Sequence, residues 1–189
     1  MEKIIFLDID GVIATPKTIR NGMFYLTPEC EDNLKHIIEN TCAKIVLISS
    51  WRYNTLEVTK DYMDSMGFNL TPHIIGITIR AYQYLDKTQK IHLSIPRGVE
   101  IKQWIDTHLT YPWYAYPERH KEWEILNEDG SFKIMKHQEV GKDFNYVILD
   151  DDTDMLLEHK DYFIWCNPDN GLEFGEACQA IEILNNIKT

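Results

Sequence analysis

The chain has 189 residues, of which 44% are hydrophobic and 26% charged, and a formal net charge of −11. This length suits one domain with a sizeable core. The composition excludes a membrane span, and the N-terminal apolar segment is too short for a secretory signal. A cytoplasmic protein is therefore expected. The negative charge argues against broad coating of nucleic acid, although it leaves room for a local cationic pocket or a bound metal ion.

Short apolar runs alternate with amphipathic segments along the chain. The apolar runs predict strands at residues 3–7, 43–50, 73–79, 145–151 and 162–166. The amphipathic segments predict helices at residues 28–41, 56–68, 98–109 and 174–187. Strands that are apolar throughout and separated by helices favour a parallel sheet covered on both faces. We therefore expect the α/β class, as a doubly wound, Rossmann-like three-layer αβα sandwich.

Local signals mark several boundaries of these elements. Thr27 suits the N-cap of the first helix and Pro28 its first turn, while Gly67 suits the end of the second helix. Gly76 interrupts the third predicted strand and weakens that prediction.

A segment at about residues 109–142 breaks the alternation. It is rich in aromatic residues and prolines, and the sequence NEDGSF at 127–132 predicts a hairpin. It is read as a surface insertion in a single domain of residues 1–189, or alternatively as a flap or partner-binding surface next to the site.

The four cysteines show no metal-binding pattern. Neither a C-x-x-C spacing nor a histidine at zinc-ligand distance accompanies them, so they are expected to be small hydrophobic side chains. They are Cys30, Cys42, Cys166 and Cys178.

Acidic residues follow two of the apolar strands. Asp8 and Asp10 precede Gly11 in FLDIDG, and Asp150 and Asp151 begin the acidic run of ILDDDTD. The carboxyl ends of parallel strands meet at one edge of a sheet, so these acids should converge and need a cation. Oxygen ligands of this kind favour Mg²⁺. Gly11 would permit a sharp turn and a close approach of the backbone to a phosphate.

Two other interpretations of the acids compete with this one. An EF-hand calcium loop is disfavoured because Met155 stands where that loop needs glycine. Asp152 and Asp154 are each at least as well explained as helix N-caps, and Asp154 is also a candidate metal ligand.

Four features occur in order along the chain: the sequence DIDGV after an apolar strand, a serine that ends the second strand, a basic residue before a later helix, and paired aspartates after a later strand. Together they resemble the four motifs of the haloacid dehalogenase (HAD) superfamily. The longer sequence segments around these motifs are similar to the HAD domain of Swiss-army-knife RNA-repair proteins. They are LTPEC, AKIVLISSWR, RGVEIKQWI and YVILDDDTDM.

This resemblance implies roles for residues of the first and fourth motifs. Asp8 matches the nucleophile that forms an aspartyl-phosphate and binds Mg²⁺, and Asp10 matches the general acid/base whose main-chain carbonyl is a metal ligand. Asp150 and Asp151 match the acidic motif that holds the metal ion.

The second and third motifs would bind and neutralise the phosphate. Ser50 matches the phosphate-binding hydroxyl, with Ser49 as the alternative, and Arg52 resembles the arginine that assists phosphate recognition in polynucleotide 3′-phosphatase domains. Arg97 matches the cationic third motif. The competing candidates for that motif are Lys87, Lys90 and Lys142.

The expected function is a Mg²⁺-dependent phosphatase acting through an aspartyl-phosphate. Its substrate would be a nucleic-acid 3′-phosphate or a small phosphorylated metabolite, and a non-catalytic signalling module is the alternative. The chain between the first two motifs is too short for a large helical cap, so an open site is expected. No membrane partner is expected, and the sequence predicts no oligomeric state.

Overall fold

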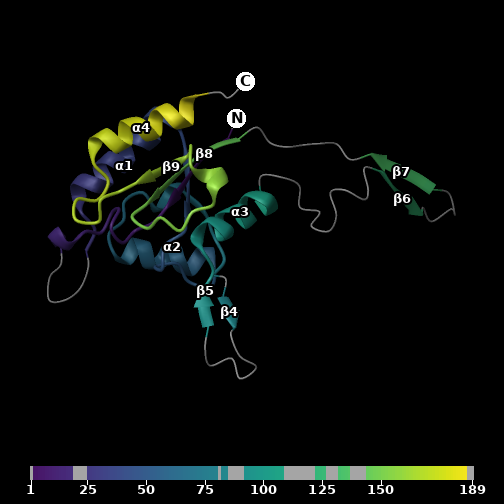
Figure 1. The fold of residues 1–189 in the computed structure, drawn as a ribbon, viewed down its shortest axis with the longest axis horizontal. Helices are drawn as coiled ribbons and strands as arrows, with labels where there is room; N and C mark the ends of the chain where they lie inside the picture. The colour runs from purple at the N-terminus through teal and green to yellow at the C-terminus, as the bar shows by residue number, and fades with distance from the viewer. Residues whose placement is uncertain are drawn as a thin grey trace.

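The computed structural model describes residues 2–18, 25–80, 82–84, 92–108, 122–126, 132–136 and 144–186 (Figure 1). Strands of the main sheet are β1 (Glu2–Leu7), β2 (Lys44–Leu47), β3 (Ile74–Ile77), β8 (Phe144–Asp150) and β9 (Phe163–Trp165). Two further pairs are formed by β4 (Tyr82–Tyr84), β5 (His92–Ser94), β6 (Glu122–Leu126) and β7 (Phe132–Lys136). The helices are α1 (Pro28–Thr41), α2 (Leu56–Ser65), α3 (Arg97–His108) and α4 (Phe174–Asn185).

The main sheet has five parallel strands in the order β3-β2-β1-β8-β9. The chain builds outward from β1 through β2 to β3 and then returns to the other side of β1 with β8. In such sheets, ligands bind outside the carboxyl ends of the strands near the point where the direction of building reverses. The carboxyl ends of β1, β2 and β8 are therefore where a site is expected.

Each face of β1 packs against a different set of helices. Ile5 and Leu7 lie in the core cluster shared with α1 and α4, whereas Ile4 and Phe6 lie in the cluster shared with α3. All four side chains are completely buried. The alternation of side chains along a strand thus explains why every residue of β1 from Ile4 to Leu7 is apolar. The predicted α/β class and three-layer arrangement are confirmed.

The boundaries of the helices follow local signals, with one difference at α1. Thr27 occupies the N-cap position but its side chain makes no capping hydrogen bond; its hydroxyl lies 3.0 Å from that of Thr15 instead. Gly67 follows α2 with a φ of 81°, as a helix end requires. Gly76 lies where a Cβ would approach the Trp104 ring to 3.1 Å, so the glycine in β3 makes room for α3.

Two hairpins stand apart from the main sheet. The antiparallel pairing of β6 with β7 confirms the predicted hairpin, although its tip and the rest of the insertion at 109–142 lie outside the described residues. The antiparallel pair of β4 and β5 was not predicted. The single-domain organisation stays a prediction. Within the described ranges, no helix is both long enough and apolar enough to cross a membrane.

Candidate functional site

The register of the central strands brings two aspartates together. Leu7 of β1 pairs with Leu149 of β8, so the residues that follow them, Asp8 and Asp150, are neighbours across the sheet. The N–H of Asp8 also donates to the Leu149 carbonyl at 3.0 Å. Both carboxylates are buried, since Asp8 is 4% exposed and Asp150 is 0% exposed. These acids therefore lie at the edge of the sheet, where the apolar core ends.

Asp151 joins them to form a cluster of three carboxylates. One ligand atom from each of Asp8, Asp150 and Asp151 lies within 4.8 Å of the others. Gly11 lies against this cluster with a φ of 70°, and a Cβ there would lie 2.5 Å from Asp151 Cγ. Only glycine fits this position. Because the donor set consists of hard oxygen atoms at a buried edge, it fits a divalent cation that prefers oxygen ligands.

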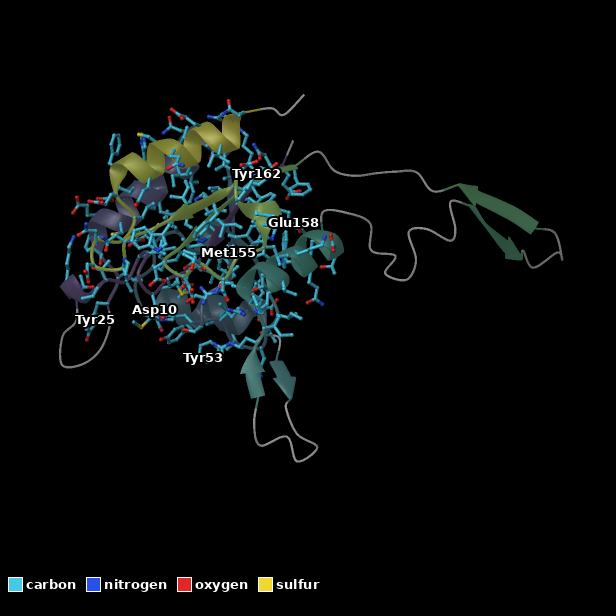
Figure 2. All side chains as sticks on the ribbon, in the orientation of Figure 1. Asp10, Tyr25, Tyr53, Met155, Glu158 and Tyr162 are labelled. Atoms are coloured by element: carbon cyan, nitrogen blue, oxygen red, sulfur yellow. The ribbon has the colours of Figure 1, made fainter. Side chains whose placement is uncertain are left out.

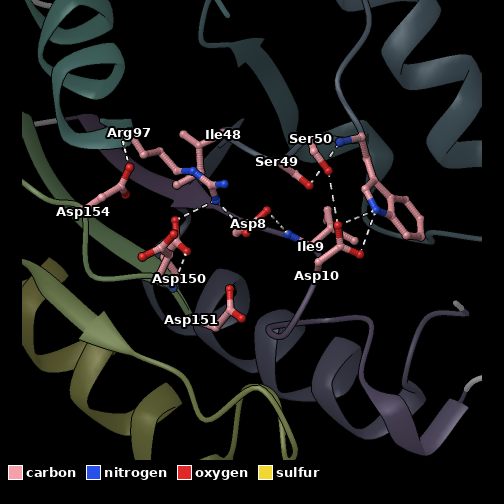
Figure 3. Close-up of polar contacts among 12 residues, drawn as sticks. Asp8, Ile9, Asp10, Ile48, Ser49, Ser50, Arg97, Asp150, Asp151 and Asp154 are labelled. Carbon is pink, nitrogen blue, oxygen red and sulfur yellow. Dashed lines mark hydrogen bonds and ion pairs between the residues drawn. The ribbon is translucent and has the colours of Figure 1, made fainter. Parts of the chain in front are cut away.

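Arg97 at the start of α3 contributes the positive charge (Figure 3). Its Nη1 lies 2.6 Å from Asp8 Oδ2 and 2.9 Å from Asp150 Oδ2. Asp154 holds this end of α3, because its Oδ2 accepts from the Arg97 N–H at 2.8 Å and its carbonyl from the Gly98 N–H at 3.2 Å. Asp154 thus binds the N-terminus of a helix that is distant in the chain, whereas the N-cap interpretation expected a helix directly after it, and the short helix that follows has Leu156 at its N-cap. The three competing lysines lie outside the described residues.

The buried carboxylates lie close to one another, and this proximity changes the pKa values of the cluster. Burial, with the neighbouring Asp8 carboxylate, raises the pKa of Asp150 to about 7. The same two causes raise the pKa of Asp151. Burial tends to lower the pKa of Arg97, but Asp8 and Asp150 outweigh it and raise the pKa overall, so the guanidinium stays charged. One guanidinium faces three carboxylates, which leaves negative charge for a further cation.

Asp10 faces away from this cluster, toward the end of β2. The Trp51 Nε1–H lies 2.9 Å from both carboxylate oxygens of Asp10, and the Ser50 hydroxyl donates to Oδ2 at 3.2 Å (Figure 3). Burial raises the pKa of Asp10 and the Asp8 charge adds to this, whereas the bonds from Trp51 and Ser50 lower it. The Ser49 hydroxyl is buried and accepts from the Trp51 N–H at 3.2 Å.

Arg52 has a different environment from the one expected. Its guanidinium donates to the carbonyls of Ile48, Ser49, Thr78 and Ile79 and to Glu100 Oε2. The side chain is 5% exposed and every N–H of the guanidinium is used within the protein. In this arrangement Arg52 offers no donor to a phosphate and instead ties the ends of β2 and β3 to α3, which corrects the sequence-based expectation.

The structure thus brings Asp8, Arg97, Asp150 and Asp151 into one cluster with Asp10 and Ser50 beside it. The sequence analysis did not predict a role for Trp51. Trp51 does pack against the core and Tyr62, but its indole N–H also binds Asp10. The only sequence signal was its position directly after the second motif.

Comparison with known families identifies this arrangement. The family model of the HAD domain in Swiss Army Knife RNA repair proteins matches residues 4–131, more than half of the chain. The chain belongs to this family. No curated protein and no solved structure matches it significantly. The matched part of this HAD domain contains Asp8, Asp10, Ser50 and Arg97 but ends before β8, so it is the sheet that adds Asp150 and its neighbour to the site.

Proposed function

We propose that the protein is a Mg²⁺-dependent phosphomonoester hydrolase that acts through an aspartyl-phosphate on Asp8. The observation that carries this proposal is the placement of Asp8 within the three-carboxylate cluster and 2.6 Å from Arg97, with the acid/base candidate Asp10 two residues later. Membership of the HAD family supports it.

In the proposed reaction, a carboxylate oxygen of Asp8 attacks phosphorus and the bond to the leaving oxygen breaks. Asp10 gives its proton to that oxygen, and its raised pKa favours holding the proton beforehand. Asp10 then takes a proton from the water that attacks the aspartyl-phosphate, which releases phosphate and restores Asp8. Arg97 and the Ser50 hydroxyl, with Ser49 as the alternative, hold and neutralise the phosphoryl oxygens.

Asp8, Asp150 and Asp151 would hold the Mg²⁺ ion, together with the main-chain carbonyl of Asp10 that the family pattern implies. When bound, the ion supplies positive charge that stabilises the transferring phosphoryl group. It also offsets the repulsion between the carboxylates.

For the substrate, we propose a nucleic-acid 3′-phosphate, in line with the RNA-repair family; a small phosphorylated metabolite is the second candidate. The signalling-module alternative has less support. Numbered along the main sheet alone, the strand order is 3-2-1-4-5, whereas receiver-like sheets follow 2-1-3-4-5, and β3 is followed by Thr78 rather than by an acid.

Phosphate release from a panel of phosphate monoesters, with Mg²⁺ and with EDTA, tests the proposal. Turnover should require Mg²⁺ and should fall at least a thousandfold in Asp8→Asn, since the variant lacks the nucleophile. Asp64→Asn, the same change at an exposed aspartate of α2, should match the wild type. Equal rates for wild type and Asp8→Asn, or no turnover of any ester, would show that the proposal is wrong.

A further inference from the structure

A pocket of about 780 Å³ has in its lining Ser50, which binds Asp10 and lies on the opposite side of Asp8 from Arg97 (Figure 3). Residues 50–54, 77–80 and Tyr62 line it, from the ends of β2 and β3 and from α2. Its volume is within the range of small-molecule sites. Ser50 and Trp51, which both bind the Asp10 carboxylate, are part of its lining, so the acid/base candidate is one hydrogen bond away from the pocket.

One wall of this pocket is aromatic. The Tyr62 ring lies edge-on to Trp51 and Tyr53, with centroid distances of 5.8 and 5.1 Å. Tyr53 is nevertheless 49% exposed, and Ile79 across the pocket lining is 52% exposed. Tyr53 lies near α2 in Figure 2. The pocket therefore includes a half-exposed aromatic side chain, Tyr53, that packs against a second ring, and an exposed aromatic ring suits stacking of a flat ligand.

Polar groups accompany the aromatic wall. The Thr78 hydroxyl is buried and has no hydrogen-bond partner within the described part of the chain, which is costly unless something satisfies it. The Asn54 amide and the Arg80 guanidinium also line the pocket, and Arg80 donates to the Ser50 carbonyl. An apolar ring without polar edges would leave these groups unused.

The orientation of Asp10 indicates which part of a substrate would enter. Asp8 faces Arg97 and the other carboxylates, whereas the Asp10 carboxylate faces Trp51 and Ser50. If Asp8 attacks phosphorus and Asp10 protonates the leaving oxygen, the group attached to that oxygen extends toward the pocket. The pocket is then the place where the leaving group binds.

We propose, on the basis of the proposed phosphatase function, that this pocket binds the leaving group as a single nucleoside whose base stacks on Tyr53. A nucleobase combines a flat ring, which suits the aromatic wall, with polar edges that can bind the Thr78 hydroxyl and the Asn54 side chain. Stacking alone does not distinguish the bases, so all four should be accepted. The nucleoside can come from a mononucleotide or from the end of an oligonucleotide.

Steady-state kinetics with three probes test this inference: adenosine 3′-monophosphate, a 3′-phosphorylated oligonucleotide and glycerol 2-phosphate, which has no ring. The wild-type kcat/KM for at least one nucleotide probe should exceed that for glycerol 2-phosphate more than tenfold. Tyr53→Ala should lower the nucleotide kcat/KM by about tenfold to a hundredfold and leave the glycerol 2-phosphate value within about twofold. The preferred nucleotide probe identifies the source of the nucleoside.

Two variants serve as controls, and a third tests the pocket at a second position. Tyr53→Phe keeps the ring and should stay within about twofold of the wild type. Tyr25→Ala removes a similarly exposed tyrosine, 41% exposed, that does not line the pocket, and should change nothing. Ile79→Asp changes the pocket lining at a second position. Thermal unfolding of all the variants shows whether each one is folded.

Failure of this inference differs from failure of the phosphatase proposal. If turnover depends on Asp8 but Tyr53→Ala affects all probes equally or none, the phosphatase stands and the nucleoside pocket is wrong. If no ester is hydrolysed, the phosphatase proposal fails, and calorimetric titration with adenosine decides about the pocket. Binding that Tyr53→Ala weakens supports the pocket, and absence of binding overturns it.

Discussion

Gly11 meets two separate requirements in one residue. Its φ of 70° is in the left-handed region, and its hydrogen atoms face Asp151, where a Cβ would lie 2.5 Å from Cγ. Gly67 shares the first requirement, with a φ of 81°, but a Cβ at that position would have no atom within 4 Å. A substitution at Gly67 therefore adds backbone strain alone, whereas the same substitution at Gly11 adds backbone strain and a clash with Asp151.

Gly11→Ala is expected to lose about 1–2 kcal/mol of stability from backbone strain and, in addition, to weaken Mg²⁺ binding and phosphate release by at least tenfold, because Asp151 must move. Gly67→Ala should lose a similar amount of stability with unchanged Mg²⁺ affinity and turnover. Urea unfolding and calorimetric Mg²⁺ titration measure the two effects. Unchanged Mg²⁺ affinity in folded Gly11→Ala would contradict the prediction.

Trp51 adjusts the proton affinity of Asp10. Its indole N–H stabilises the carboxylate and so lowers the pKa of Asp10 against the effect of burial. Trp51→Phe removes that donor, so the pKa should rise. In the proposed reaction Asp10 must be protonated for the leaving group to depart, so the alkaline limb of the kcat profile should move to higher pH. Ser50→Ala should move it in the same direction by less, and a shift to lower pH would contradict this.

At the scale of the elements, Arg52 and Glu100 join the sheet to α3. Their ion pair is buried, with side chains 5% and 6% exposed, and Arg52 also binds carbonyls after β2 and β3. Burial lowers the pKa of Arg52 despite the attraction of Glu100. Because α3 begins with Arg97, this connection helps to keep Arg97 beside Asp8.

Glu100→Gln is expected to lower the free energy of unfolding by about 3–5 kcal/mol, because it leaves the Arg52 charge buried without its partner. Lys102→Met breaks two more exposed pairs, one with Asp106 on the same helix and one with Glu158, and should cost less than about 1 kcal/mol. Urea unfolding measures both. If Arg52→Lys kept full stability and raised only KM, Arg52 would be a phosphate-binding residue after all.

At the scale of the whole molecule, the carboxylate cluster couples folding to pH and to metal. Burial and mutual repulsion raise the pKa of Asp150 to about 7 and raise those of Asp10 and Asp151. A carboxyl with a higher pKa in the folded state binds more protons folded than unfolded. Its contribution to stability therefore falls as the pH rises from about 4 to about 7.

In EDTA, the unfolding temperature of the wild type is expected to fall between pH 5 and pH 7.5 by more than that of Asp150→Asn, which lacks the carboxyl with the raised pKa. Saturating Mg²⁺ should raise the wild-type Tm more at pH 7.5 than at pH 5, because the ion binds the deprotonated cluster. Thermal unfolding at both pH values measures this. A Mg²⁺ effect that is larger at pH 5 would rule it out.

The local features of this protein follow from its amino-acid sequence alone. Apolar runs and helical periodicity predicted the five strands of the main sheet and the four helices, because these patterns depend on neighbours within a few residues. The same reasoning placed Asp8, Asp10 and Asp150 at strand ends, and the family match added Arg97. Which groups meet across the sheet depends on the folded chain: Arg97 with Asp8, Trp51 with Asp10, and Arg52 with Glu100 rather than with a phosphate. Such contacts join residues far apart in the chain, and the register of β1 and β8 and the packing of α3 set them.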